Sequence, residues 1–188
     1  MKKESILFIV IALLVGLLVG IIVTNARKDS PSNAGSSSPA SAPSVNYQQQ
    51  IKMLQDVVSK EPGNRNAWVQ LGHNYFDSDQ PMLAIDAYDK ALAIDGNDAN
   101  VLTDQGVMFR RLGWFDRAVE NFVKASNISP NHQQSLYNLG IVYRYDLQDI
   151  PKAIAAWERY INLNPSGAGA AQVRGELEQL KSLPAARQ

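Results

Sequence analysis

One pattern of residues occurs three times between residues 65 and 165, and it constrains the fold of this chain more than any other feature. An interval of 34 residues separates its copies in the first half of the pattern: Trp68, Leu102 and Leu136; Gly72, Gly106 and Gly140; Tyr75, Phe109 and Tyr143. The second half keeps this interval in the first two copies: Ala84 and Ala118; Tyr88 and Phe122; Ala91 and Ala125. In the third copy the corresponding residues, Ala153, Trp157 and Tyr160, follow those of the second copy by 35 residues, so one residue is inserted after Tyr143. Such an interval is typical of stacked helix-turn-helix units.

Each copy predicts two helices, because its apolar residues recur three and four positions apart. The expected pairs are residues 65–77 with 81–94, 99–112 with 115–128, and 133–146 with 150–163. Residues that do not continue a helix mark the boundaries: Pro62, Gly96, Pro130 and Pro165. The small residues in the pattern allow the two helices of a pair to approach closely. One hairpin cannot bury its apolar face alone, so the copies are expected to stack.

The three copies resemble the tetratricopeptide repeat. The pattern is written as Trp68-x-x-Leu71-Gly72-x-x-Tyr75 followed by Ala84, Tyr88 and Ala91, and it returns as Leu136-x-x-Leu139-Gly140-x-x-Tyr143. Two positions depart from it, since Gln105 replaces the usual leucine and Tyr160 the usual small residue. The resemblance implies an all-α fold, an α-solenoid of about three tetratricopeptide helical hairpins with flanking cap helices. The repeats would cover residues 65–98, 99–132 and 133–167.

A long apolar segment precedes the repeats. Residues 6–23 are eighteen consecutive residues without charge, which is enough for a helix to cross a membrane, so residues 6–24 are predicted to be a transmembrane anchor after a short tail, residues 1–5. A cleaved secretory signal is the alternative, but its apolar region is usually shorter. Basic residues lie on both sides of the segment, which leaves the orientation open. We expect a single-pass protein of the bacterial inner membrane with its repeats on the exported, periplasmic side.

Three further segments complete the predicted organisation. Residues 25–45 are rich in serine, proline and alanine and predict a flexible linker. Residues 46–64 predict a helix over 46–60 that represents half a repeat, because Leu54 and Val57 stand where the second helix of a preceding copy would place them. Residues 168–188 predict a closing cap helix, over 168–183, and a tail.

Composition and motifs exclude several classes of function. The 18 basic residues equal the 18 acidic ones, so the chain lacks the basic excess expected of a nucleic-acid-binding protein. It has no cysteine, and neither of its two histidines has a second ligand at metal-binding spacing. No phosphate-binding loop or catalytic set of side chains is recognisable. We therefore expect neither a cofactor nor enzymatic activity.

A surface remains as the candidate site. The residues just beside the packing stripe of each first helix follow an i, i+4, i+7 spacing and share one helical face: Val69, His73 and Phe76; Thr103, Val107 and Arg110; Tyr137, Ile141 and Arg144. The resemblance implies that this face lines a concave groove in which partner peptides lie. Its apolar members are expected to form an exposed patch, and such patches mark binding sites. The alternative is that a flanking helix folds into the groove and covers it.

The arginines of this face divide into two kinds in the sequence. Arg110 and Arg144 are expected to be neighbours without an acidic residue beside them; they either point into water or bind a carboxylate of a partner. Arg111 is expected to pair with Asp77. Some chaperone-binding members of the family carry a carboxylate clamp. The matching positions here are Val69, His73, Asp104, Gln134 and Asn138. Asp104 would repel a carboxylate, so that function is disfavoured.

The sequence thus predicts a membrane-anchored scaffold that binds a partner protein or peptide in the groove of its repeats. Two alternatives remain. The architecture also resembles the tetratricopeptide components of bacterial c-type cytochrome maturation, which present apocytochrome to a haem-attaching complex. The protein could instead be a self-assembling structural membrane protein, associating through the groove or through the small residues Ala12, Gly16 and Gly20 of the apolar segment.

Overall fold

The structure is a computed structural model that describes residues 46–182. The predicted tail, transmembrane anchor and linker, residues 1–5, 6–24 and 25–45, lie outside the described residues. Within residues 46–182, none of the helices has the length and apolar character needed to span a membrane.

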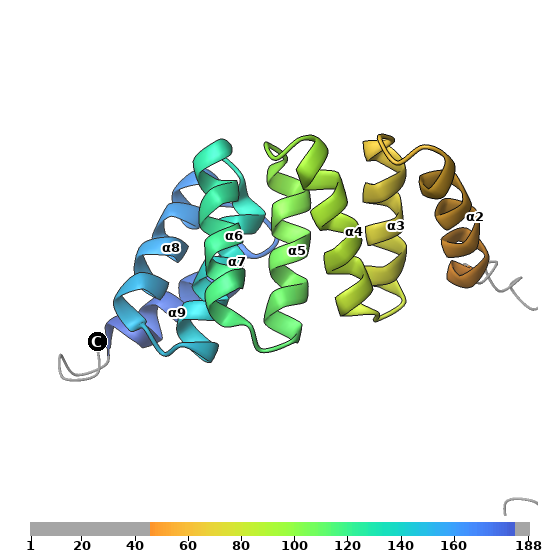
Figure 1. Ribbon diagram of the computed structural model, residues 1–188. Coiled ribbons are helices and arrows are strands. Elements are labelled where there is room, and N and C mark those ends of the chain that lie inside the picture. The colour runs from red at the N-terminus through yellow and green to blue at the C-terminus, as the bar shows by residue number, and fades with distance from the viewer. Residues whose placement is uncertain (1–45, 183–188) are drawn as a thin grey trace, which may run out of the picture. The chain divides into compact units, whose positions relative to one another are not determined.

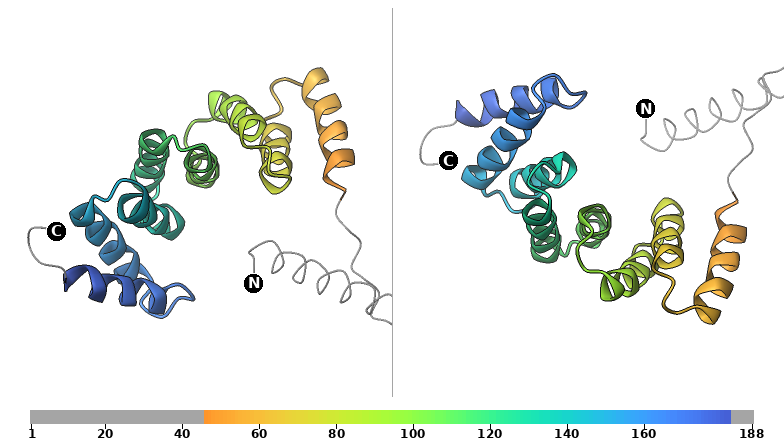
Figure 2. Two further views of the ribbon diagram at one scale, coloured as in Figure 1. Left: turned by 90° about the horizontal axis from the view of Figure 1, so that it is seen from below. Right: turned by 90° about the horizontal axis from the view of Figure 1, so that it is seen from above.

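The described part of the chain is helical throughout and contains no strand (Figure 1). The helices are α2 (Tyr47–Lys60), α3 (Arg65–Asp77), α4 (Pro81–Ile94), α5 (Ala99–Arg111), α6 (Phe115–Ile128), α7 (Gln133–Ile141), η1 (Val142–Asp146), α8 (Ile150–Leu163) and α9 (Ala170–Lys181). The hairpins α3–α4, α5–α6 and α7–α8 follow one another in a row. The first helices, α3, α5 and α7, contact each other on one side of this row, toward which the row bends, and the second helices lie on the other side (Figure 2).

The starts of the first helices repeat at the same interval as the core residues. Asn64, Asp98 and His132 are 34 residues apart, and the side chain of each accepts a hydrogen bond from a backbone N–H in the first turn of α3, α5 or α7. Asn46 caps α2 in the same way. These caps satisfy N–H groups that have no partner within the helix, and they explain why the predicted starts agree with the observed ones.

The inserted residue of the third copy is absorbed by a π-helix. In the first two repeats, Gln80 N–H donates to Tyr75 O and Trp114 N–H to Phe109 O, whereas in the third Asp149 N–H donates to Tyr143 O, one residue further back. The prediction of one α-helix over residues 133–146 is therefore corrected: the α-helix ends at Ile141 and η1 follows. A single π-helical turn accommodates an extra residue without moving the helix that comes after it.

A close approach of two helices defines each hairpin. Gly72, Gly106 and Gly140 face the rings of Tyr88, Phe122 and Trp157, all of them buried. A methyl group on Gly106 would lie 2.6 Å from a ring carbon of Phe122, and the other two glycines are at least as tightly covered. Neighbouring alanines on the second helices, including Ala84, Ala118 and Ala153, are fully buried. The small residues of the repeat are thus required by contact between the helices.

The two departures from the repeat pattern have structural explanations. Gln105 is buried, and its Nε2 donates to Ile85 O at 3.3 Å and to Asp89 Oδ1 at 2.7 Å, while its Oε1 accepts from Asn121 Nδ2 at 2.8 Å. It therefore links the first repeat to the second with satisfied hydrogen bonds. Tyr160 packs against Tyr137 at 5.5 Å between ring centroids, and its hydroxyl occupies the space beside Gly169, just before α9.

Candidate functional site

The candidate site is the groove face, which we define as the solvent-facing side of the first helices α3, α5 and α7. Eight of the nine predicted residues lie on it with at least part of their side chains accessible. Thr103 is the exception, since only 1% of it is exposed. Its hydroxyl donates to Ala99 O at 2.7 Å and lies 3.5 Å from His132 Nδ1 of the next repeat. Thr103 therefore supports the α5–α7 contact and cannot line a binding surface.

The predicted apolar patch is less exposed than expected. Val69, Phe76, Val107, Tyr137 and Ile141 are half-buried and pack against the core. The reason is that the first helices of neighbouring repeats touch one another, so each apolar side chain is partly covered by the next helix. The groove face thus offers only the edges of these side chains.

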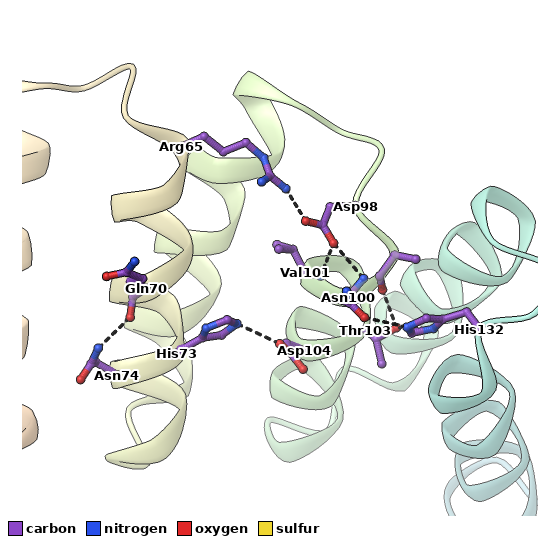
Figure 3. Close-up of polar contacts among 11 residues, drawn as sticks. Arg65, Gln70, His73, Asn74, Asp98, Asn100, Val101, Thr103, Asp104 and His132 are labelled. Carbon is purple, nitrogen blue, oxygen red and sulfur yellow. Dashed lines mark hydrogen bonds and ion pairs between the residues drawn. The ribbon is translucent and has the colours of Figure 1, made fainter. Parts of the chain in front are cut away.

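Amide side chains are the more accessible members of the groove face. Asn66, Asn100 and Gln134 occupy equivalent positions on the three first helices and are exposed, as is Gln70. Asn100 Oδ1 accepts from His132 Nε2 at 3.0 Å, which leaves its NH₂ group without a hydrogen-bond partner among residues 46–182 (Figure 3). Each amide carries both donor and acceptor groups, so the row can bind groups of either kind.

His73 and Asp104 form a hydrogen-bonded pair across the centre of the groove face, which is an ion pair when His73 is protonated (Figure 3). His73 Nε2 on α3 lies 3.1 Å from Asp104 Oδ2 on α5. The imidazole also meets the ring of Tyr88 edge-on at 5.8 Å. The hydrogen bond to Asp104 raises the pKa of His73 above its usual value, against the opposing effect of partial burial.

The pKa of His132 is shifted in the opposite direction to that of His73. Its Nδ1 accepts the Ser135 N–H at 3.3 Å, so its Nε2 carries the proton that is donated to Asn100. Burial lowers the pKa of His132, because the neutral ring is better accommodated than the charged one. Sequence alone gave no role to this residue, whose position resembled a simple turn.

The two histidines predict opposite dependences of stability on pH. The pKa of His73 is 6.5 in the unfolded chain and higher in the folded protein. Its contribution to stability is therefore complete below pH 6.5 and is lost as the pH rises through the folded pKa. The folded pKa of His132 lies below 6.5, so this residue contributes to the stability of the fold above pH 6.5, and the contribution is lost as the pH falls through the folded pKa. We expect His73→Gln to lower the unfolding midpoint more at roughly pH 5 than at pH 8, and His132→Asn to do so more at pH 8. Thermal unfolding at the two pH values tests this, and parallel shifts would contradict it.

The arginines are paired within the chain, which corrects the expectation that Arg110 and Arg144 are free. Arg110 contacts both oxygens of Asp146 at 2.5 and 3.2 Å, and Arg144 Nε lies 3.9 Å from Glu176. Arg111 pairs with Asp79 at 3.0 Å instead of Asp77, and its guanidinium lies over the ring of Phe76. The partners of Arg110 and Arg144 were missed because the π-helix and the cap helix break the 34-residue interval on which the prediction relied.

The cap helix α9 covers one end of the groove face. Glu176 also accepts the Tyr145 hydroxyl at 2.6 Å, so α9 lies beside η1. The alternative of a covering helix therefore holds at the third repeat only. Two small cavities flank the face: one of about 240 Å³ beside Tyr137, Tyr160 and Gly169, and one of about 300 Å³ between α2 and α3. In residues 46–182, no three acidic or histidine side chains gather in a way that could hold a metal ion.

Comparisons with known proteins agree with this architecture. Residues 66–98 match the model of the tetratricopeptide repeat family. The chain is 27% identical over 120 residues to the human protein O-mannosyl-transferase TMTC3, and 29% identical over 118 residues to a probable UDP-N-acetylglucosamine–peptide N-acetylglucosaminyltransferase, SPINDLY, of Hordeum vulgare. These alignments cover 62% and 59% of this chain but only 13% and 12% of those proteins.

Several solved structures have the same fold. The crystal structure of MamA superposes with a TM-score of 0.68 at 25% identity and covers 73% of this chain and 80% of that one. YrrB, described as a tetratricopeptide repeat protein with an unusual peptide-binding site, superposes with a TM-score of 0.63 at 22% identity and covers 69% of this chain and 66% of that one. The first repeat domain of Spaghetti (RPAP3), bound to the HSP90 peptide SRMEEVD, superposes with a TM-score of 0.56 at 22% identity and covers 62% of this chain and 92% of that one. With the repeated caps, glycines and aromatic residues described above, these matches show that residues 66–98 are a tetratricopeptide repeat and that the described residues have the tetratricopeptide repeat fold.

Proposed function

We propose that this protein is a membrane-anchored scaffold that holds a segment of a partner protein against the groove face. The observation that carries the proposal is the row of exposed amides, Asn66, Asn100 and Gln134, which repeats from helix to helix beside the half-buried apolar edges. An extended peptide has a donor and an acceptor at every residue, and such amides can bind both. YrrB and Spaghetti, which share the fold, are described with peptide-binding roles, and this supports a peptide ligand here.

The charges of the groove face favour an internal segment of the partner over an acidic C-terminus. The guanidinium groups of Arg110 and Arg144 already face carboxylates of this chain. Asp104 lies at the centre of the face and would repel a terminal carboxylate. Displacing Asp146 from Arg110 would leave a poorly exposed carboxylate unpaired. The proposed ligand is therefore an uncharged or weakly basic extended segment.

We further propose that the protein itself is not an enzyme. Two of its relatives are named as glycosyltransferases, but the shared segment is only 12% to 13% of their length. The described residues offer exposed amides and ion pairs on the groove face, and the perturbed histidines serve a helix cap and an inter-repeat pair. These features favour binding over catalysis.

Site-specific photo-crosslinking tests the proposed surface. A photoreactive amino acid is placed at Asn66 or Gln134 on the groove face, and at Lys90 or Glu120 on the second helices as a matched exposed control. We expect the groove positions to capture one discrete partner in cells and the control positions not to. A synthetic peptide of the captured segment should compete for the crosslink. Capture from the second helices alone would contradict the proposal, and an apocytochrome as the captured protein would favour a role in cytochrome maturation.

The membrane anchor is predicted to be retained, because residues 6–23 are longer than the apolar region of a usual cleaved signal. We expect the protein extracted from membranes to have the intact mass of the full chain, 188 residues. A mass beginning at Arg27 would show instead that the apolar segment is a cleaved signal. The two outcomes are separated by one mass spectrum.

A further inference from the structure

Each end of the described array is half a repeat. α2 occupies the place of a second helix, yet no first helix precedes it among residues 46–182. α9 occupies the place of a first helix, since it packs against α8 and its Glu176 contacts Arg144 and Tyr145 of η1, and no second helix follows it in the described part. The two ends are therefore complementary: one lacks the kind of helix that the other supplies.

α9 keeps the glycine that the internal hairpins use for close contact. Gly175 follows Gly140 by 35 residues and continues the series of Gly72 and Gly106. The earlier glycines are covered by aromatic rings, whereas no atom of the described residues lies within 4 Å of a methyl group placed on Gly175. Glycine inside a helix reduces helix stability relative to alanine.

α2 presents an apolar surface against which a first helix can pack. Leu54 stands 34 residues before Tyr88, the residue whose ring covers Gly72. Beside it, Met53 is 54% exposed and Val57 is 36% exposed, which is unusual for apolar side chains at the end of an array. These three residues line the cavity of about 300 Å³ between α2 and α3. A first helix belonging to a preceding repeat would pack in this position.

We propose that two copies of this protein associate head to tail, with α9 of one copy packed against α2 of the next. Gly175 then faces Leu54 of the second copy, and the two helices form a composite hairpin equivalent to α3–α4. The interface joins two different surfaces, so each dimer keeps one free end of each kind and can extend into chains. Arg174 and Glu178 are exposed beside Gly175, at the places that Leu139 holds on α7 and Tyr143 on η1, so the contact contains charged groups as well as apolar ones and is expected to be reversible and dependent on concentration.

The absence of cysteine allows a direct test by disulfide formation between copies of the full chain in detergent. Leu54→Cys and Gly175→Cys variants are prepared separately, mixed and mildly oxidised. We expect a disulfide-linked dimer from this mixture and its loss when Gln48→Cys, on an exposed part of α2, replaces Leu54→Cys. Because the partners carry one cysteine each, a bond between residues 54 and 175 forms only between copies. Equal yields from the two mixtures would overturn the proposal.

Sedimentation equilibrium gives an independent readout. The N-terminal segment is the same in every variant, so differences between variants report on the ends of the array. We expect Gly175→Leu to abolish the increase of average mass with concentration without lowering the unfolding midpoint, because the site is open in a single copy. Ala93→Leu adds the same side chain at an exposed position on α4 and should leave association unchanged. Association that survives Gly175→Leu, or a parent protein that stays monomeric, would overturn the proposal.

Discussion

Replacing Trp157 with alanine is expected to lower the free energy of unfolding by about 3 to 5 kcal/mol. The side chain is 2% exposed, covers Gly140, and donates from its Nε1 to Tyr137 O at 3.2 Å. Truncation would leave a cavity between α7 and α8 and remove this hydrogen bond. Such a loss is a large share of the stability of a small domain. Urea unfolding of the full chain in detergent, followed by the helical circular dichroism signal, measures it.

Trp68→Ala is the matched control. The repeat pattern places Trp68 among the main packing residues, but the structure leaves its side chain half-buried, with its Nε1 donating to Pro62 O at an exposed position. Less apolar surface is lost on truncation, so we expect a cost below that of Trp157→Ala. If Trp68→Ala destabilised the protein as much as Trp157→Ala, the assignment of the core would be wrong.

Gly106→Ala is expected to lower the stability by about 1 to 3 kcal/mol, the usual cost of overpacking a core. Alanine is favoured over glycine inside a helix by about 1 kcal/mol, so a stabilising effect would follow from helix propensity alone. The added methyl group would lie 2.6 Å from Phe122, whose ring is fully buried and cannot withdraw without moving α6 from α5. The steric effect is therefore expected to exceed the propensity effect.

Gly175→Ala separates the two effects. This glycine has the same place in the repeat, but open space surrounds it within the described residues of one copy. At protein concentrations at which the parent is monomeric, we expect the substitution to raise stability by up to about 1 kcal/mol. Destabilisation at Gly175 as large as that at Gly106 would show that the contact with Phe122 is not the cause.

Helix positions and packing were largely predictable from the sequence. The 34-residue interval fixes the first and second helices, since glycine, alanine and aromatic residues recur where two helices must touch, and a polar residue caps each first helix at the same interval. Local patterns of this kind depend on the helix period and on the chemistry of caps, and both are visible in a sequence. Apart from η1, the differences lie at helix ends: α9 begins at Ala170, two residues after the predicted start, beyond Gly167 and Gly169.

The details of the groove face were less predictable, because they depend on contacts between repeats. The π-helix η1 moves Asp146 to Arg110, and the cap helix brings Glu176 to Arg144, so two arginines that looked unpaired have partners. Thr103 has the spacing of a groove residue, but the approach of α7 buries it. A helical-wheel argument identifies the face of one helix and says nothing about how much of that face its neighbours cover.

The central claim, that partners bind along the first helices, is tested most directly by titrating a peptide of the captured partner against two variants with the same substitution. Val107→Arg places a charge in the middle of the groove face, and Val123→Arg places it on the second helix α6, where the valine is exposed. Far-ultraviolet circular dichroism checks that both remain folded. The account predicts that Val107→Arg weakens binding about tenfold or more, equivalent to about 1.4 kcal/mol, and that Val123→Arg has no effect. Unchanged affinity for Val107→Arg with a loss for Val123→Arg would contradict it.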